Sequence, residues 1–208
     1  MSQSYFTVKG QTENLIEIQR SKFICNIKGV NDEVGAKEFV ESIRKKHSLA
    51  THNCYAYIAD DKGLIQKFSD DGEPQGTAGL PMLEVLKAKK MFKTVAVVTR
   101  YYGGIKLGTG GLTRAYGGSV SECLGLSKVV NMLLAEFLDV TTDYDGYSIL
   151  LKLLNNENVA VNNTEFLNNI KVSLAVKKEY SQTFCDRLVD SFNGKIKIDK
   201  LNEDFYPF

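Results

Sequence analysis

Apolar side chains over the first 130 residues alternate between strand spacing and helix spacing. Strands are predicted at residues 15–18, 23–30, 53–59, 64–68 and 95–99. The tetrapeptide Asp-Asp-Lys-Gly at residues 60–63 predicts a hairpin between the third and fourth of these strands. Helices are predicted from an Asp32 N-cap to about Lys46, at residues 80–90, and behind the glycines that end near residue 111.

The pattern starts again near residue 130. Its predicted strand, helix, strand, strand, helix and strand cover residues 131–141, 144–155, 159–163, 170–178, 180–192 and 195–201. This β-α-β-β-α-β order is typical of the split-βαβ, ferredoxin-like arrangement, which completes a sheet by itself. We therefore predict an α+β protein of two domains, residues 1–130 and residues 131–208. Because no Pro- or Ser-rich linker marks the join, a single continuous α+β domain is the alternative.

Composition and overall charge are those of an ordinary soluble globular protein. Among 208 residues, 26 are Lys or Arg and 25 are Asp or Glu, so the overall charge indicates no polyanionic partner. Residues 84–114, however, hold seven cations and one acid, a local net charge of +6. Such a cluster would concentrate phosphates by electrostatic attraction. For residues 87–93 taken alone, a solvated helix face is the simpler interpretation.

The four cysteines are far apart and form no CxxC pair. Residues 1–10 lack the apolar core of a signal peptide, and no run reaches the length of a membrane span, so we predict a cytoplasmic protein with free, mostly buried thiols. His47 and His52 are the only histidines, and without a second ligand pair we predict no metal or cofactor. His52 and Cys54 share one face of a predicted strand. They could form a nucleophile pair, although a buried thiol beside a histidine is commoner.

A glycine-rich segment follows the strand predicted at residues 95–99. It consists of Arg100, Tyr101, Tyr102 and then Gly103, Gly104, Gly108, Gly110 and Gly111. The first N–H groups of a helix lack internal partners and favour anions, and glycine permits close approach of a ligand. With Arg100, Lys106 and Arg114 nearby, the segment is predicted to bind phosphate, and its tyrosines to stack on bases or to wall the core. No Walker motif is present; a tight structural turn is the alternative.

Residues 69–79 are a second candidate site. Asp70, Asp71 and Glu73 could hold a divalent cation or act as acid and base. We favour instead a loop whose aspartates cap its own backbone N–H groups. Gly76 and Thr77 open the helix predicted at residues 80–90, and they are a second candidate anion cradle.

Residues 100–116, RYYGGIKLGTGGLTRAY, resemble the signature of the YigZ/IMPACT family. Three further blocks match in the family's order and spacing: SKFICNI from residue 21, ATHNCYAY from residue 50 and SDDGEPQGTAGLP from residue 69. Together the matches cover about residues 21–124. The remaining third resembles the smaller C-terminal domain of bacterial members in its pattern alone.

The resemblance implies an N-terminal domain of the ribosomal-protein fold shared with GHMP kinases and elongation factor G domain IV. It implies a C-terminal domain like the end of elongation factor G. Both folds recur in RNA-binding translation proteins, although each fold also hosts unrelated activities. Eukaryotic relatives act on a translation-control kinase through its activator. Because they carry an additional N-terminal domain, that partner is not transferred to this chain.

Three functions are consistent with these observations. The first is a non-catalytic module that binds RNA or a ribonucleoprotein and has a translation-related regulatory role. The second is an enzyme for a small phosphorylated or nucleotide substrate, with the glycine-rich segment as its cradle. The third is a protein-interaction adaptor. We favour the first because no complete nucleophile–base set is visible in the sequence.

Overall fold

The structure is a computed structural model that describes residues 4–208. Residues 1–3 lie outside the described residues. They are the start of the predicted domain 1–130 and of the segment, residues 1–10, in which the sequence shows no signal-peptide core. Residues 4–208 form five helices and two antiparallel sheets, so the predicted α+β class is confirmed. They form two compact units, the N-terminal unit (Tyr5–Val130) and the C-terminal unit (Asn131–Phe208 together with Ser4).

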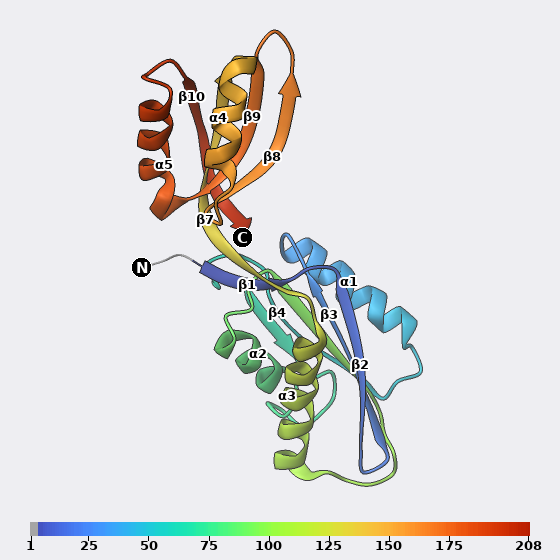
Figure 1. The fold of residues 1–208 in the computed structure, drawn as a ribbon. Coiled ribbons are helices and arrows are strands. Elements are labelled where there is room, and N and C mark those ends of the chain that lie inside the picture. Colours follow the sequence, from blue (N-terminus) through green and yellow to red (C-terminus); the bar gives the residue numbers. More distant parts are fainter. Residues whose placement is uncertain (1–3) are drawn as a thin grey trace. The chain divides into compact units, whose positions relative to one another are not determined.

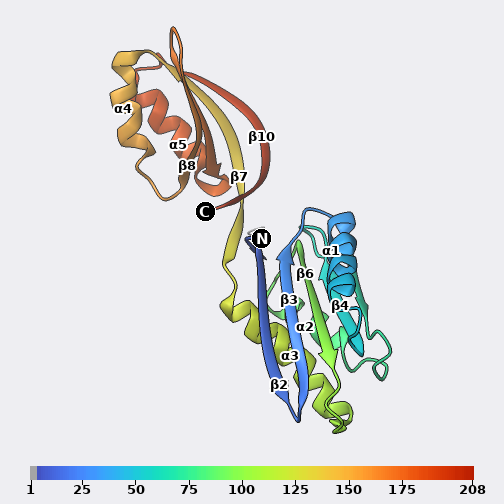
Figure 2. The same cartoon turned by 90° about the vertical axis from the view of Figure 1, so that its right-hand side faces the viewer.

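The N-terminal unit is built on a sheet with the strand order β2-β3-β6-β4-β5 (Figure 1). Its strands are β2 (Gln11–Ile18), β3 (Ser21–Gly29), β4 (His52–Ile58), β5 (Gln66–Ser69) and β6 (Thr94–Tyr101). Helix α1 (Glu33–Lys46) covers one face, and α2 (Gly79–Ala88) and α3 (Gly108–Leu126) cover the other (Figure 2). The short strand β1 (Ser4–Val8) forms backbone hydrogen bonds between Phe6 and both Lys90 and Phe92.

Strand β6 lies in the middle of this sheet and is buried on both faces. Val95 and Val97 pack in the core under α1, whereas Ala96 and Val98 pack in the core under α2 and α3. A nearly continuous apolar run is typical of a strand that is covered on both sides. Because side chains alternate along a strand, Arg100 continues the row of Ala96 and Val98 and enters the α2/α3 side.

Helix α1 begins where the sequence predicts. Its N-cap, Asp32, accepts a hydrogen bond from the Gly35 backbone N–H at 2.8 Å, which satisfies one of the free N–H groups of the first turn. Its buried residues are Ala36, Phe39, Val40 and Ile43. Those of α3 are Leu112, Ala115, Tyr116, Ser119, Val120, Cys123 and Leu124. Both buried faces follow the predicted helical spacing.

The C-terminal unit contains the predicted order of elements. Its strands are β7 (Val129–Thr142), β8 (Val159–Phe166), β9 (Ile170–Lys177) and β10 (Lys197–Pro207). They pair antiparallel in the order β10-β7-β9-β8. Helices α4 (Tyr144–Leu154) and α5 (Lys178–Ser191) lie on one face of the sheet (Figure 2). The core between them includes Leu138, Leu150, Ile170, Leu174, Phe184 and Leu188.

Several elements differ from the sequence-based predictions: β2 begins at Gln11 rather than near residue 15, and β8 extends to Phe166 rather than to residue 163. Strand β1 is not predicted because its five residues are too short to establish a period. Helix α3 begins at Gly108 rather than near Gly110, because its first turn contains glycine and no apolar repeat. Strand β10 extends to Pro207, past a register shift between Lys200 and Glu203 that interrupts the alternation. Among residues 4–208, no helix is long and apolar enough to cross a membrane.

We predict that the C-terminal unit folds by itself, because its apolar core draws every member from residues 138–198. Residues 129–208, which keep β7 whole, should give a dispersed amide NMR spectrum and a cooperative unfolding transition. A collapsed spectrum with poor dispersion would contradict autonomous folding.

Candidate functional site

Arg100 and Glu73 form a buried ion pair at the end of β6. Arg100 Nη1 lies 2.7 Å from Glu73 Oε1, and the two side chains are 6% and 3% exposed. The same carboxylate oxygen accepts a hydrogen bond from the Tyr116 hydroxyl at 2.7 Å, and Arg100 Nη2 donates to Ser21 Oγ at 3.3 Å. The cluster therefore joins β3, β6, α3 and the loop between β5 and α2.

The structure contradicts the phosphate-binding role predicted for Arg100. Besides its bonds to Glu73 and Ser21, its guanidinium carbon lies 5.4 Å from the centre of the Phe23 ring and 5.3 Å from that of Tyr102. A buried guanidinium that is already neutralised by a carboxylate cannot offer its charge to a ligand in solvent. The pair also explains the burial, because an unpaired charge in this position would be strongly unfavourable.

Asp70 occupies the anion cradle that the sequence predicts at Gly76 and Thr77. Its Oδ1 accepts hydrogen bonds from the backbone N–H groups of Ala78 and Gly79, at 3.0 and 2.8 Å, and its Oδ2 accepts one from Gly76 at 2.8 Å. The anion at the N-terminus of α2 is therefore a side chain of the protein itself. The Thr77 hydroxyl is also engaged, because it donates to the Pro74 carbonyl at 2.6 Å.

Asp71 and His52 also hold this loop in place. Asp71 Oδ2 accepts a hydrogen bond from the Asn53 N–H at 2.6 Å, and Arg44 Nη2 lies 3.1 Å from Asp71 Oδ1. His52 donates from Nδ1 to the Asp71 carbonyl at 2.8 Å. These contacts agree with the structural role that we favour for the acidic loop. In residues 4–208, no group of three or more His, Cys, Asp or Glu side chains is placed to hold a metal ion.

Cys54 does not have the properties of a catalytic nucleophile. Its thiol is buried and donates to the Asp70 carbonyl at 2.9 Å. Burial raises the pKa of this thiol far above its usual value, so the reactive thiolate is absent at neutral pH. His52 and Cys54 share a strand face, as predicted, but the histidine bonds to the acidic loop rather than to the thiol.

The glycine loop, residues 102–111, joins β6 to the first turn of α3. A Cβ atom on Gly103 would lie 2.1 Å from the Arg20 backbone, so only glycine fits there. Gly104 and Gly108 have φ angles of +85° and +70°, which L side chains rarely adopt. A Cβ on Gly111 would meet Leu107 at 3.1 Å. The tight-turn interpretation therefore accounts for Gly103, Gly104 and Gly108, whereas at Gly111 a Cβ would be crowded and Leu107 would have to shift.

Gly110 is the exception. Its backbone is helical, and an added Cβ would meet its nearest neighbour, Arg114 Nη1, at an ordinary contact distance of 3.7 Å. Glycine within a helix is about 0.5–1 kcal/mol less stable than alanine. The packing of the described residues therefore provides no reason for glycine at this position.

The N-terminus of α3 has no side-chain cap. Its N-cap is Leu107, no side chain accepts a hydrogen bond there, and its first turn contains no acid. Gly108, Thr109 and Gly110 are exposed. The free N–H groups and the positive end of the helix dipole therefore face solvent. Lys106 precedes this turn, and Arg114 extends back beside Gly110.

The two tyrosines have different environments. Tyr101 is half-buried on the α1 side, and its hydroxyl lies 3.0 Å from His47 Nδ1. Burial lowers the pKa of His47, which favours a neutral ring against this hydroxyl. Tyr102 is 46% exposed, and its ring lies over the Arg100 guanidinium. The structure therefore places Tyr101 in the wall of the domain and Tyr102 at the surface.

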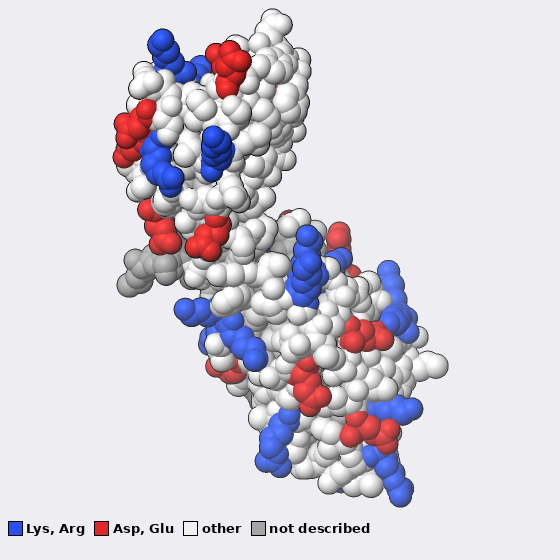
Figure 3. Space-filling model, in the orientation of Figure 1, with Lys and Arg blue, Asp and Glu red and all other residues white. Residues whose placement is uncertain are grey.

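The cations predicted as one basic cluster are divided in space. Lys89, Lys90 and Lys93 precede β6, whereas Lys106 follows it. An eight-residue strand is roughly 26 Å long, so these lysines lie at opposite ends of the sheet. Positive and negative side chains are interspersed on the face drawn in Figure 3. The local charge of +6 is therefore not a single patch.

Two other cations lie at the same end of the sheet as the glycine loop, and sequence analysis did not select them. Arg20 is in the β2–β3 turn, against whose backbone Gly103 packs, and Lys22 is opposite Tyr101 in the β3–β6 register. Both are exposed, and neither forms an ion pair with a residue from 4 to 208. The SKFICNI block, which includes Lys22, was the available signal.

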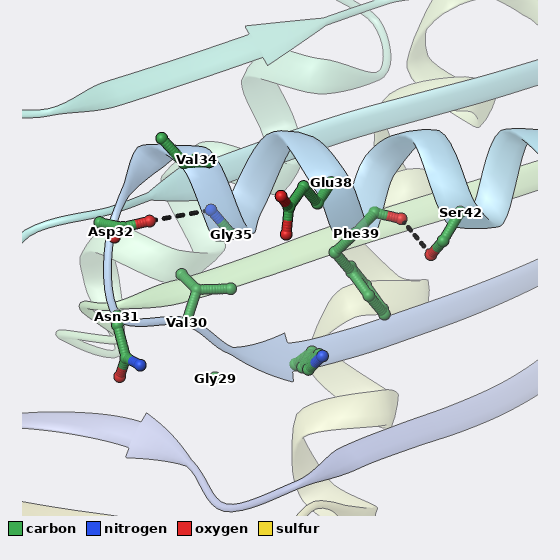
Figure 4. A pocket seen from close by; sticks show the side chains of 10 residues that line it. Gly29, Val30, Asn31, Asp32, Val34, Gly35, Glu38, Phe39 and Ser42 are labelled. Atoms are coloured by element: carbon green, nitrogen blue, oxygen red, sulfur yellow. Dashed lines mark hydrogen bonds between the residues drawn. The ribbon is translucent and has the colours of Figure 1, made fainter.

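A separate cavity of about 530 Å³ lies between the start of α1 and the end of β3 (Figure 4). Two of its polar groups are engaged within the helix: Asp32 caps the Gly35 N–H, and the Ser42 hydroxyl donates to the Phe39 carbonyl at 2.7 Å. None of the site residues predicted from the sequence lines this cavity.

Comparisons with known proteins connect these residues to one family. Residues 19–124 match the family described as the Impact N-terminal domain. IMPACT family member YvyE of Bacillus subtilis is 43% identical over 198 residues, which cover 95% of this chain and 91% of that protein. IMPACT family member YigZ of Escherichia coli is 36% identical over 191 residues, covering 90% and 93% of the two chains.

More distant similarity extends to eukaryotes and to a solved structure. Protein IMPACT of Xenopus laevis is 36% identical over 106 residues, 49% of this chain and 32% of that protein. A crystal structure titled as that of a hypothetical protein is 32% identical, with a TM-score of 0.62, and covers 98% of this chain.

We predict that Arg100→Ala destabilises the protein by about 3–5 kcal/mol, because it leaves the buried Glu73 carboxylate without its partner. The matched control is Lys87→Ala, which breaks the exposed Lys87–Glu84 pair and should cost less than about 1 kcal/mol. Urea unfolding followed by circular dichroism measures both. Equal effects of the two substitutions would contradict a structural role for the buried pair.

Proposed function

The chain belongs to the IMPACT family, and we propose that it is a non-catalytic cytoplasmic module that binds RNA through the glycine loop, with a translation-related regulatory role. The observation that carries this proposal is the exposed first turn of α3. It presents free backbone N–H groups between two exposed cations, Lys106 and Arg114. Backbone N–H groups at a helix N-terminus are suited to phosphate oxygens, and exposed cations add affinity.

Gly110 supports the same proposal. A phosphate that bonds to the N–H groups of the first turn must approach the backbone closely, and a side chain at this position would stand in its way. The fold requires glycine at Gly103, Gly104 and Gly108 and would crowd a Cβ at Gly111, but Gly110 has room for a Cβ. Close approach of a ligand gives this glycine a purpose that packing does not.

The folds that we propose for the two units also favour RNA. The strand order β10-β7-β9-β8, with both helices on one face, is that of a ferredoxin-like domain. For the N-terminal unit we propose the ribosomal-protein fold that the family resemblance implies. Both folds recur in RNA-binding translation proteins, and fold similarity alone does not establish function.

A binding role is favoured over catalysis by the way the other candidate groups are used. Asp70 and Asp71 accept hydrogen bonds from nearby backbone N–H groups. Glu73 is bonded to Arg100 and Tyr116. The Cys54 thiol stays protonated. The acids and the thiol on which a catalytic mechanism would depend therefore already have structural partners.

We predict that a labelled single-stranded RNA binds at low salt and that Lys106→Ala and Arg114→Ala each weaken binding about fivefold. An exposed charge contact is worth roughly 1 kcal/mol. Affinity should decrease with salt with a log–log slope of about −0.7 for each phosphate neutralised. Fluorescence anisotropy measures both effects.

Lys62→Ala is the matched control for these variants. Lys62 is an exposed lysine of the β4–β5 hairpin, which lies at the end of the sheet opposite the glycine loop. Its substitution should leave the affinity unchanged. Equal losses for Lys62 and Lys106, or no binding by the wild type at low salt, would refute the proposed site.

Gly110→Ala should separate ligand binding from stability. Because the new Cβ fits the folded structure, the variant should be more stable by up to about 1 kcal/mol. It should nevertheless bind RNA more weakly, because the methyl group obstructs approach to the first turn. A variant that is more stable and binds as tightly as the wild type would show that no ligand approaches Gly110.

A further inference from the structure

The Tyr102 side chain is fixed by contacts with other residues of the protein, and nearly half of it remains exposed to solvent. Its backbone N–H donates to Thr51 Oγ1 at 3.2 Å, and its ring centre lies 5.3 Å from the Arg100 guanidinium carbon. Arg100 is itself fixed by Glu73 and Ser21. Yet Tyr102 is 46% exposed, and within residues 4–208 its ring makes no other ring or cation contact beyond that with Arg100. One face of the ring is therefore supported and the rest is available.

The support differs from that of an ordinary surface tyrosine. The Arg100 guanidinium is buried and cannot move away from Glu73 without leaving a buried charge unpaired. A cation over a ring face attracts the ring, more strongly when the cation is removed from water. The orientation of Tyr102 is therefore set before any ligand arrives, which reduces the entropy lost when a ligand stacks on it.

The position of the ring relates it to the proposed phosphate contacts. Tyr102 begins the glycine loop, directly before Gly103 and four residues before Lys106. An aromatic surface beside exposed cations is the combination that proteins use to hold single strands, because bases stack while the backbone is neutralised. Tyr101 cannot take this part, since it lies on the α1 side against His47.

We propose that Tyr102 is a one-sided stacking platform for an unpaired base, and that the glycine loop therefore selects single-stranded over double-stranded nucleic acid. In a duplex the base faces are already covered by their neighbours, and exposing one costs a few kcal/mol. Arg100 acts as a positioning residue that holds the ring, rather than as a ligand for phosphate. This inference rests on the proposed function and identifies which form of nucleic acid the site accepts.

The test compares a labelled RNA strand of about 12 nucleotides with the same strand annealed to its complement and with an abasic strand of equal length. Wild-type protein should bind the single strand more tightly than the duplex and the abasic strand. Tyr102→Ala should weaken binding to the single strand about fivefold or more, the loss expected from one stacked base. It should leave binding to the abasic strand unchanged, and Tyr102→Phe should retain the wild-type affinities.

The controls separate this inference from the proposed function. Tyr144→Ala removes another exposed tyrosine, in α4, and should not alter binding. If Lys106→Ala weakens binding but Tyr102→Ala does not, the proposed stacking on Tyr102 is refuted and the proposed phosphate site is retained. If Tyr102→Ala lowered the affinity for the normal strand and for the abasic strand equally, stacking would also be refuted. If the wild type binds no strand at low salt, the proposed function itself fails.

Discussion

The buried pair of Arg100 and Glu73 is the interaction on which the rest of the N-terminal unit depends. Two opposite charges removed from water must stay together, since separating them leaves an uncompensated charge in the core. Because Glu73 also accepts from Tyr116, and Arg100 also donates to Ser21, one pair fixes four segments at one end of the sheet. The loop that carries Glu73 is thereby held where Asp70 meets the start of α2.

This constraint separates the charged residues of the family's sequence blocks into two groups. Arg100, Glu73 and Asp70 are turned inward and stabilise the fold, although their charges made them candidate binding or catalytic residues in the sequence. Lys106 and Arg114 remain outside and are free to meet a ligand. The inward group nevertheless serves the outer surface, because Arg100 supports the ring of Tyr102 from beneath.

Much of the secondary structure could be predicted, because α1 and α3 bury faces that follow the helical period without interruption. The role of Arg100 was predictable in principle: it shares strand parity with Ala96 and Val98, so it points into the same core. Its charge suggested a ligand contact, and its partner Glu73, 27 residues away, could not be identified from spacing. The basic cluster was misjudged because residues close in sequence are separated by the length of β6, while Arg20 is brought near by a packing contact with Gly103.

The N-termini of α2 and α3, which both lie next to glycines, can be compared within the N-terminal unit. Both α2 and α3 follow a loop with several glycines, and both offer free N–H groups at the positive end of a helix. At α2 the chain supplies the anion itself, since Asp70 accepts three hydrogen bonds from Gly76, Ala78 and Gly79. At α3 the chain supplies no acid and no cap, and it places two cations there instead. An anion at α2 thus belongs to the fold, whereas the corresponding position at α3 is open to an anion from outside. The same physical chemistry that makes Asp70 structural leaves the first turn of α3 without an anion from the chain itself.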